Sequence, residues 1–264
     1  MSDLAARLPS PSRRTSALID ALTMAGRRIR LTRRNVDALI TSLMLPVMLM
    51  LMFVYLFGGA INTGTKYVDY VVPGVILLCA GFGSAITAVT VSEDMTGGII
   101  DRLRSMDVGG PAVLAGHVAA SVARNAASTV LVFGVAIAIG FRPAAGILDW
   151  LAVVGVLLAF VLAMSWLAAA IGLIAKSPEA ANGFTFLVMF LPYASSAFVP
   201  VDTMPSWLQG FARHQPVTPV IETVRALLLG TPAGSTIWTA LGWCAAILAG
   251  TIAISRRLFQ RHTG

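Results

Sequence analysis

An all-helical integral membrane fold is predicted by the composition of the chain and by the spacing of its apolar runs. Of the 264 residues, 57% are hydrophobic and only 12% are charged, whereas soluble domains carry about 25% charged residues. The mean hydropathy is +0.82. The apolar runs do not alternate apolar and polar residues, which disfavours a β-barrel. So little charge excludes a soluble globular protein.

Six of the apolar runs are long enough to cross a hydrocarbon core about 30 Å thick as helices. The predicted spans cover residues 38–58, 70–92, 111–141, 150–175, 180–199 and 236–255. They divide the sequence into a basic tail at 1–37, a six-span domain at 38–255 and a second basic tail at 256–264. This division leaves no room in the sequence for a second large soluble domain.

The formal net charge of +7 is concentrated at the two ends of the sequence. Residues 1–34 contribute +6, residues 256–264 contribute +3, and the residues between them contribute −2. Fourteen of the 19 Lys and Arg residues lie in the two tails or in segments 93–110 and 176–179. Because basic loops stay in the cytoplasm, we predict a multi-pass protein of the cell membrane with both termini cytoplasmic. The charge is an orientation signal, and no nucleic-acid partner is expected.

The basic tail before the first span has an amphipathic pattern. Apolar residues recur every three or four positions, with arginines on the opposite side: Leu18, Leu22, Ala25 and Ile29 against Arg27, Arg30 and Arg34. This pattern predicts a helix lying in the membrane interface. Two interpretations stay open: an orientation signal that binds anionic lipid, or a helix that also docks a cytoplasmic partner.

The segment between spans two and three has the densest mixture of charges in the chain. Ser92 is a candidate N-cap, and Glu93 and Asp94 suit the start of a helix, where the helix dipole is positive. Ile99 and Leu103 share one helical face. We predict a short cytoplasmic helix here, whose apolar face and charges form a contact surface for another protein or for the membrane surface.

The segment between spans five and six is rich in proline and aromatic residues. A helix is predicted over 220–229, with Thr218 as its N-cap, Pro219 at its first position and Gly230 just past its end. Its body is too apolar to lie free in water, so we expect two short re-entrant helices that pack on the outer side of the bundle. Trp207 is expected to anchor this segment at the membrane interface.

Few residues in the sequence are suited to chemistry. His117 and Arg124 are the ionisable residues well inside a predicted span, and their spacing of seven puts them on one helical face. They either pair helices and snorkel to the interface, or line a transport path. Cys79 and Cys244 lie in apolar runs, and the sequence shows no nucleotide, nucleophile or metal-ligand motif. We therefore expect no catalytic residue, no metal and no bound cofactor.

Two of these segments together resemble the type-2 ATP-binding-cassette (ABC) exporter permeases, most closely the daunorubicin-resistance type. Residues 93–106, EDMTGGIIDRLRSM, are similar to the cytoplasmic coupling helix of that family, although Asp107 stands where the family usually has proline. Residues 198–208, FVPVDTMPSWL, followed by Gln215, Pro216 and Arg225, are similar to its outer signature, with Gln215 in place of the usual asparagine. The resemblance extends over essentially the whole chain.

The resemblance implies a permease that moves a drug-like, antibiotic or lipid-like amphiphile out of the cell. A separate ABC ATPase subunit would bind and hydrolyse the ATP, so the permease has no ATPase site of its own. A second permease copy or a sister permease would complete the membrane part, in contact with membrane lipids. The implied coupling residues are Glu93, Asp94, Gly97, Arg102, Leu103 and Arg104, and the implied outer signature residues are Pro200, Pro205, Trp207, Pro216 and Arg225.

Two other functions are alternatives at this point. A proton-driven secondary transporter would use His117 and Arg124, although its usual intramembrane carboxylates are not evident in the predicted spans. A membrane scaffold that transports nothing is the second alternative. A lipid-modifying enzyme is disfavoured because the sequence shows no catalytic constellation.

Overall fold

Helices account for most of the chain that the computed structural model describes, which is residue 44 and residues 46–61, 63–97 and 110–261. The first described helix, Pro46–Phe57, ends in the π-helical turn η1 (Phe53–Phe57). The other elements are α3 (Tyr67–Thr96), α5 (Gly110–Ala138), α6 (Ile147–Ile174), α7 (Pro178–Met189), η2 (Val201–Thr203), α8 (Ser206–His214), α9 (Val217–Leu228) and α10 (Thr236–Arg261). The predicted interface helix before residue 37 lies outside the described residues.

Four helices are long and apolar enough to cross a membrane: α3, α5, α6 and α10. They confirm the second, third, fourth and sixth predicted spans as apolar helices. The helix Pro46–Phe57 covers the later part of the first predicted span. No strand occurs in the described ranges.

The fifth predicted span is not one continuous helix. α7 ends at Met189, and residues 190–198 form successive turns. Its 12 residues extend about 18 Å, which is shorter than the hydrocarbon core. Pro192 explains the break, because proline lacks an N–H and its ring clashes with the carbonyl four residues earlier. Hydropathy detects an apolar segment here but not the interruption.

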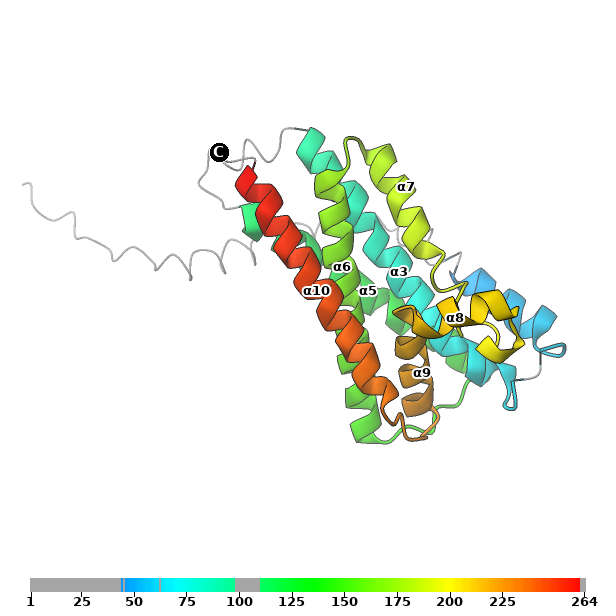
Figure 1. The fold of residues 1–264 in the computed structure, drawn as a ribbon. Coiled ribbons are helices and arrows are strands. Elements are labelled where there is room, and N and C mark those ends of the chain that lie inside the picture. Colours follow the sequence, from blue (N-terminus) through cyan, green and yellow to red (C-terminus); the bar gives the residue numbers. More distant parts are fainter. Residues whose placement is uncertain (1–43, 45, 62, 98–109, 262–264) are drawn as a thin grey trace, which may run out of the picture.

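α3 is the central helix of the bundle, in contact with α5, α6, α7 and α9 (Figure 1). In the most apolar stretch of α3, 67% of the residues are buried, against 17% in the corresponding stretch of α10. Its core includes Val71, Val75, Ile76 and Leu77, all fully buried. α5 and α6 pack directly on α3, whereas α10 packs on α6 and α9, and these helices leave apolar faces outward, as lipid-facing helices do.

Small residues let the helices approach α3 closely. A Cβ on Gly172 of α6 would lie 2.5 Å from the carbonyl oxygen of Ala88. A Cβ on Gly74 would lie 2.7 Å from the backbone of Ala197, in the turns after α7. Close approach at glycine and alanine is how helices gain packing energy within lipid.

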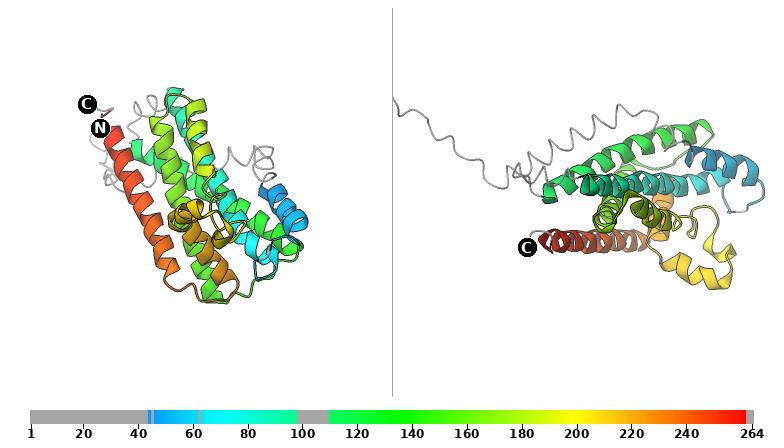
Figure 2. Two further views of the ribbon diagram at one scale, coloured as in Figure 1. Left: turned by 45° about the vertical axis from the view of Figure 1, so that its right-hand side comes forward. Right: turned by 90° about the horizontal axis from the view of Figure 1, so that it is seen from above.

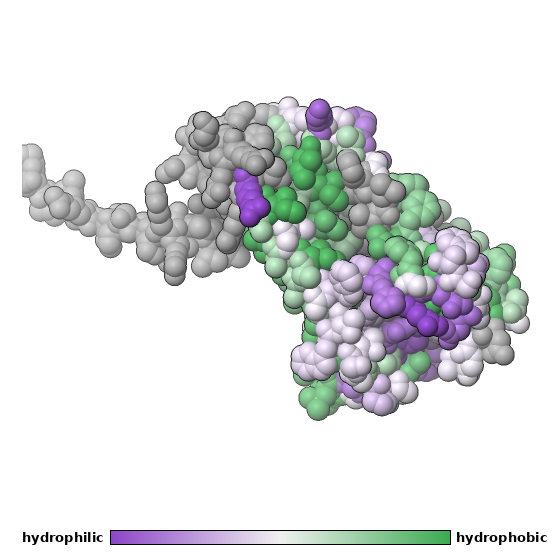
Figure 3. All heavy atoms as spheres, viewed as in Figure 1, coloured by the Kyte–Doolittle hydropathy of each residue, from purple (hydrophilic) through white to green (hydrophobic). Residues whose placement is uncertain are grey.

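The ends of the described helices lie at two opposite ends of the bundle. The end of α3, the start of α5, the connection from α6 to α7 and the end of α10 lie at one end of the bundle (Figures 1 and 2). We call this the Gly97 end. The short helices α8 and α9 and the start of α10 lie toward the opposite end, which we call the α9 end. Hydrophilic side chains gather over α8 and at the Gly97 end, with hydrophobic atoms between them (Figure 3).

The short helices near the α9 end match the two predicted re-entrant helices in order but not in their boundaries. α9 begins at Val217, so Thr218 is not its N-cap. The Oε1 atom of Gln215 instead accepts a hydrogen bond from the Val217 N–H at 3.1 Å. Gly230 follows the helix with φ +68°, a conformation that favours glycine.

Candidate functional site

The last turn of α3 carries the first residues of the predicted coupling segment. α3 continues through Ser92, Glu93 and Asp94 to Thr96, and the Gly97 N–H donates to the Glu93 carbonyl at 2.8 Å. The prediction that Ser92 caps a new helix is therefore wrong, because no glycine or proline lies between Ser92 and Gly97 to end α3 there. Glu93 is exposed and Asp94 is buried. The implied coupling residues that lie outside the described ranges are Arg102, Leu103 and Arg104.

Asp94 faces α5 and pairs with His117. The Asp94 Oδ2 atom lies 3.0 Å from the His117 Nε2 atom, and each residue is 6% exposed. Val91, Leu114 and Val118 pack in a small apolar cluster beside the pair. A hydrogen-bonded pair compensates part of the cost of burying a carboxylate. The carboxylate implied by the resemblance to face an ATPase thus points into the bundle.

Arg124 makes a second polar contact between α5 and α3. Its Nη2 atom donates to the Gly83 carbonyl at 2.8 Å and lies 3.3 Å from the Thr87 hydroxyl. His117 and Arg124 do share one face of α5, as their spacing predicts, and that face is turned toward α3. Both residues therefore pair helices. A role in lining a transport path stays a prediction.

A buried network of small polar side chains continues this seam into α6. The Ser165 hydroxyl lies 2.8 Å from the Ser121 hydroxyl and 3.4 Å from the Ser84 hydroxyl. Asn125 Nδ2 donates to the Ser121 carbonyl at 3.0 Å and lies 3.4 Å from the Ser84 hydroxyl. Sequence reasoning missed these residues. The signal was the recurrence of polar side chains at 121, 125 and 128 on one face of an apolar helix.

Arg225 connects three separate parts of the chain near the α9 end. From α9, its Nε donates to the Tyr70 carbonyl of α3 at 3.0 Å, and its Nη2 donates to the Ser196 carbonyl at 2.6 Å. The guanidinium carbon also lies 3.7 Å from the centre of the Tyr70 ring, a cation–π arrangement. Burial lowers the pKa of Arg225 below its ordinary value, and Tyr70 and Glu222 oppose this only in part. The guanidinium group stays charged in proteins, and its hydrogen bonds to the two carbonyl oxygens hold α9 against α3.

The remaining outer signature residues fix the path of the chain around Arg225. The backbone turns at three prolines: Pro200 precedes η2, Pro205 precedes α8 and Pro216 precedes α9. Trp207 is 78% exposed, which suits the predicted interfacial anchor. Because proline has a fixed φ and no N–H, each of these positions ends one element and starts the next.

Further hydrogen bonds tie the outer signature to the bundle. The Tyr67 hydroxyl of α3 donates to the Phe198 carbonyl at 2.9 Å. Gln215 Nε2 donates to the Leu191 carbonyl at 3.1 Å. At the far side, the Ala144 N–H donates to the Leu228 carbonyl at 2.9 Å, which joins α9 to the α5–α6 connection. The outer signature is thus a packed layer at this end of the bundle.

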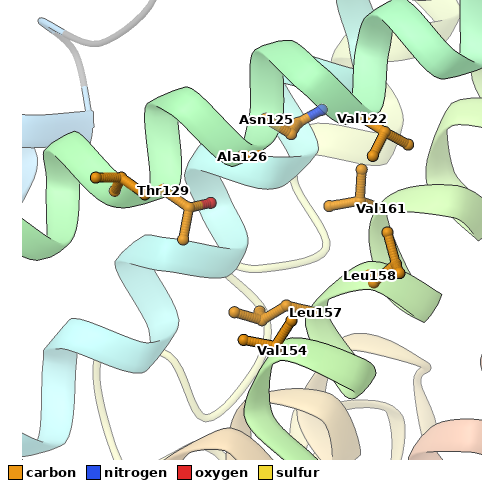
Figure 4. A pocket seen from close by; sticks show the side chains of 9 residues that line it. Val122, Asn125, Ala126, Thr129, Val154, Leu157, Leu158 and Val161 are labelled. Carbon is orange, nitrogen blue, oxygen red and sulfur yellow. The ribbon is translucent and has the colours of Figure 1, made fainter. Parts of the chain in front are cut away.

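An apolar groove of about 220 Å³ opens between α5 and α6. Figure 4 shows the two helices facing each other across it, with Val122 and Thr129 on one side and Val154, Leu157 and Val161 on the other. Drug-sized sites are usually about 300–1,000 Å³, so this groove is smaller than such a site.

These features define the class of the protein as a polytopic helical membrane protein, with polar contacts along its helix seams and a packed layer of short helices at one end. Residues 20–229 match the ABC-2 type transporter family, and the chain belongs to that family. It is the membrane (permease) subunit of an ABC transporter.

Relatives align over nearly the full length of the chain. The daunorubicin resistance ABC transporter permease protein of Streptomyces coeruleorubidus is 30% identical over 250 residues, which cover 94% of this chain and 87% of that protein. A probable doxorubicin resistance ABC transporter permease protein of Mycobacterium tuberculosis is 26% identical over 265 residues, covering 97% and 95% of the two chains. These comparisons confirm the family that the two sequence motifs indicate.

Proposed function

We propose that this permease works as half of the membrane part of an ATP-driven exporter, with a separate ABC ATPase subunit docked on the connection between α3 and α5. The observation that carries this proposal is the place of that connection in the chain. It joins two helices that are paired by Asp94 and His117, and its sequence has the mixed charge of a contact surface. Arg102 and Arg104 are the residues that we expect to contact the ATPase.

The proposed cargo is an amphiphilic, drug-like or lipid-like molecule that leaves the cell. Two relatives are named for resistance to daunorubicin and doxorubicin, and resistance by transport requires outward movement. Cargo of this kind would meet mainly apolar surfaces, because the described helices present valine, leucine and phenylalanine to their surroundings. We propose that a second permease copy or a sister permease completes the pathway.

We propose that the Gly97 end, where α10 also ends, faces the cytoplasm, and that both termini of this cell-membrane protein are cytoplasmic. The positive-inside count supports this orientation. Single cysteines at Arg142 and Lys176, in a background without Cys79 and Cys244, test it with a membrane-impermeant maleimide. We expect labelling of Arg142→Cys in intact cells and of Lys176→Cys only after the cells are opened. The reverse pattern would overturn the orientation.

The ATPase-docking role is tested by charge reversal in a complex. The chain is co-expressed with the ABC ATPase subunit that co-purifies with it, and Arg102 and Arg104 are both changed to Glu. We expect the double variant to lose the ATPase on purification and to lose ATP-dependent uptake of daunorubicin into inside-out vesicles. Arg213→Glu, on α8 near the other end of the bundle, is the matched control and should keep both. If the double variant still binds the ATPase and transports as the wild type does, the docking role is wrong.

A further inference from the structure

The interface between α3 and α5 contains two polar contacts in matching register. Asp94 meets His117, and Thr87 meets Arg124. The two residues on α3 are seven apart and so are the two on α5, which is two helical turns in each case. Two antiparallel helices are therefore joined at the same pair of levels, and the Asp94–His117 contact is the one nearer the Gly97 end.

The Asp94–His117 contact lies close to the ends of α3 and α5 that the 98–109 connection joins. Asp94 is two residues before Thr96, the last residue of α3, and His117 is seven residues after Gly110, the first residue of α5. Both side chains are buried. Removing either side chain would take away a buried hydrogen-bonded contact, which is more costly than losing an exposed ion pair.

Any force applied to residues 98–109 enters the bundle through the ends of α3 and α5. If those ends could separate, a movement of the connection would be absorbed by their separation and would not reach the rest of the bundle. Packed helices that keep their contacts instead move together as one body. The contact between Asp94 and His117 resists separation at the level where the force enters.

We propose that Asp94 and His117 are positioning residues, which lock α3 and α5 into one rigid lever that transmits ATPase movement from the 98–109 connection to the membrane bundle. This inference rests on the proposed function. It gives Asp94 a role inside the permease in place of the direct ATPase contact implied by the resemblance. Arg124, bound to Gly83 and Thr87 two turns deeper, extends the same lever toward the middle of the bundle.

The test measures whether α3 and α5 move together in the complete complex. Spin labels are attached at Thr96 and Ala119, which are both exposed, in a background where Cys79 and Cys244 are replaced by alanine. A second label pair, at Thr96 and the exposed Lys176, reports on movement of α3 against the α6–α7 connection. Distances are compared in lipid nanodiscs, without nucleotide and with ATP and vanadate.

In the wild-type complex we expect the Thr96–Ala119 distance to stay constant while the Thr96–Lys176 distance changes. Asp94→Ala and His117→Ala should each retain the ATPase subunit and its ATP hydrolysis. In both variants the Thr96–Ala119 distribution should broaden with nucleotide. Daunorubicin uptake per ATP hydrolysed should fall by a factor on the order of 5 to 150, the usual range for coupling between sites.

Two further variants separate this role from general stability. The exchange variant Asp94→His/His117→Asp restores the pair and should recover a constant Thr96–Ala119 distance and most of the coupling. Asp202→Ala removes the exposed contact between Arg213 and Asp202 and should change neither measurement.

Three results would overturn the proposal. The first is a wild-type Thr96–Ala119 distance that changes as much as the reference distance. The second is a pair of alanine variants with unchanged distances and coupling, and the third is an exchange variant that stays as uncoupled as the single variants. A wild-type chain that holds no ATPase would overturn the proposed function itself, and the lever with it, so the two failures are distinguishable.

Discussion

Gly172 in α6 is the position at which a single added methyl group should separate the bundle most directly. A Cβ there would lie 2.5 Å from the Ala88 carbonyl oxygen and 2.8 Å from the Val91 Cβ. Ordinary contact begins near 3.4 Å, so α3 and α6 would have to move apart by about 0.9 Å. The backbone atom cannot turn away as the end of a flexible side chain can. Gly172→Ala should therefore strain the packing of the central helix.

The expected cost follows from measured overpacking in protein cores. Inserted methyl groups destabilise by about 1–3 kcal/mol. For a chain of this size, each kcal/mol corresponds to a fall of roughly 2–4 °C in the melting temperature. Gly172→Ala should thus melt about 2–12 °C below the wild type.

The chain offers both a probe and a matched control for this measurement. Cys79 and Cys244 are buried, so a thiol-reactive fluorophore reports unfolding in detergent as these thiols become accessible. Gly155 lies in the same helix, and a Cβ there would meet nothing within 4 Å. Gly155→Ala should melt at or slightly above the wild-type temperature, since alanine favours helix. Equal melting temperatures for the two variants would refute the close approach of α6 to α3.

Two more substitutions probe the polar contacts. Arg225→Leu removes two charged hydrogen bonds and should destabilise the protein by about 2–4 kcal/mol. The control, Arg213→Leu on the exposed face of α8, should cost under about 1 kcal/mol. Equal shifts in melting temperature for the two variants would contradict the proposal that Arg225 holds α9 against α3. Gly83→Ala would place a Cβ 2.2 Å from the Asn125 Oδ1 atom and should lower the melting temperature. Adding Asn125→Ala should recover part of that loss in a double-mutant cycle, and purely additive effects would mean that the two residues do not meet.

Hydropathy predicts the long apolar helices of this fold well, because insertion into lipid depends on composition over about 20 residues. It fails where one residue changes the backbone. Pro192 ends the helix of the fifth predicted span within an apolar segment, and Gln215 sets the start of α9 in place of Thr218. Such local decisions depend on single hydrogen bonds, which a window average does not detect.

The candidate site was predicted in part. The sequence pattern identified Arg225 as a signature residue and placed His117 and Arg124 on one face, but it named no partner for any of them. Their partners are distant in sequence: Arg225 binds the Tyr70 carbonyl, 155 positions away. Backbone carbonyls carry no sequence signal, so these contacts follow only from the packing of the helices.

The sequence by itself determined that this chain enters a membrane and to which transporter family its motifs are similar, and its basic ends support the orientation that we propose. Each depends on composition or on local order along the chain. The tertiary structure decided what the charged residues do. Asp94 reads as a surface residue in a polar segment, yet the last turn of α3 buries it against His117. A carboxylate at a helix end faces water or a neighbouring helix according to how the helices pack, and packing is a property of the assembled bundle.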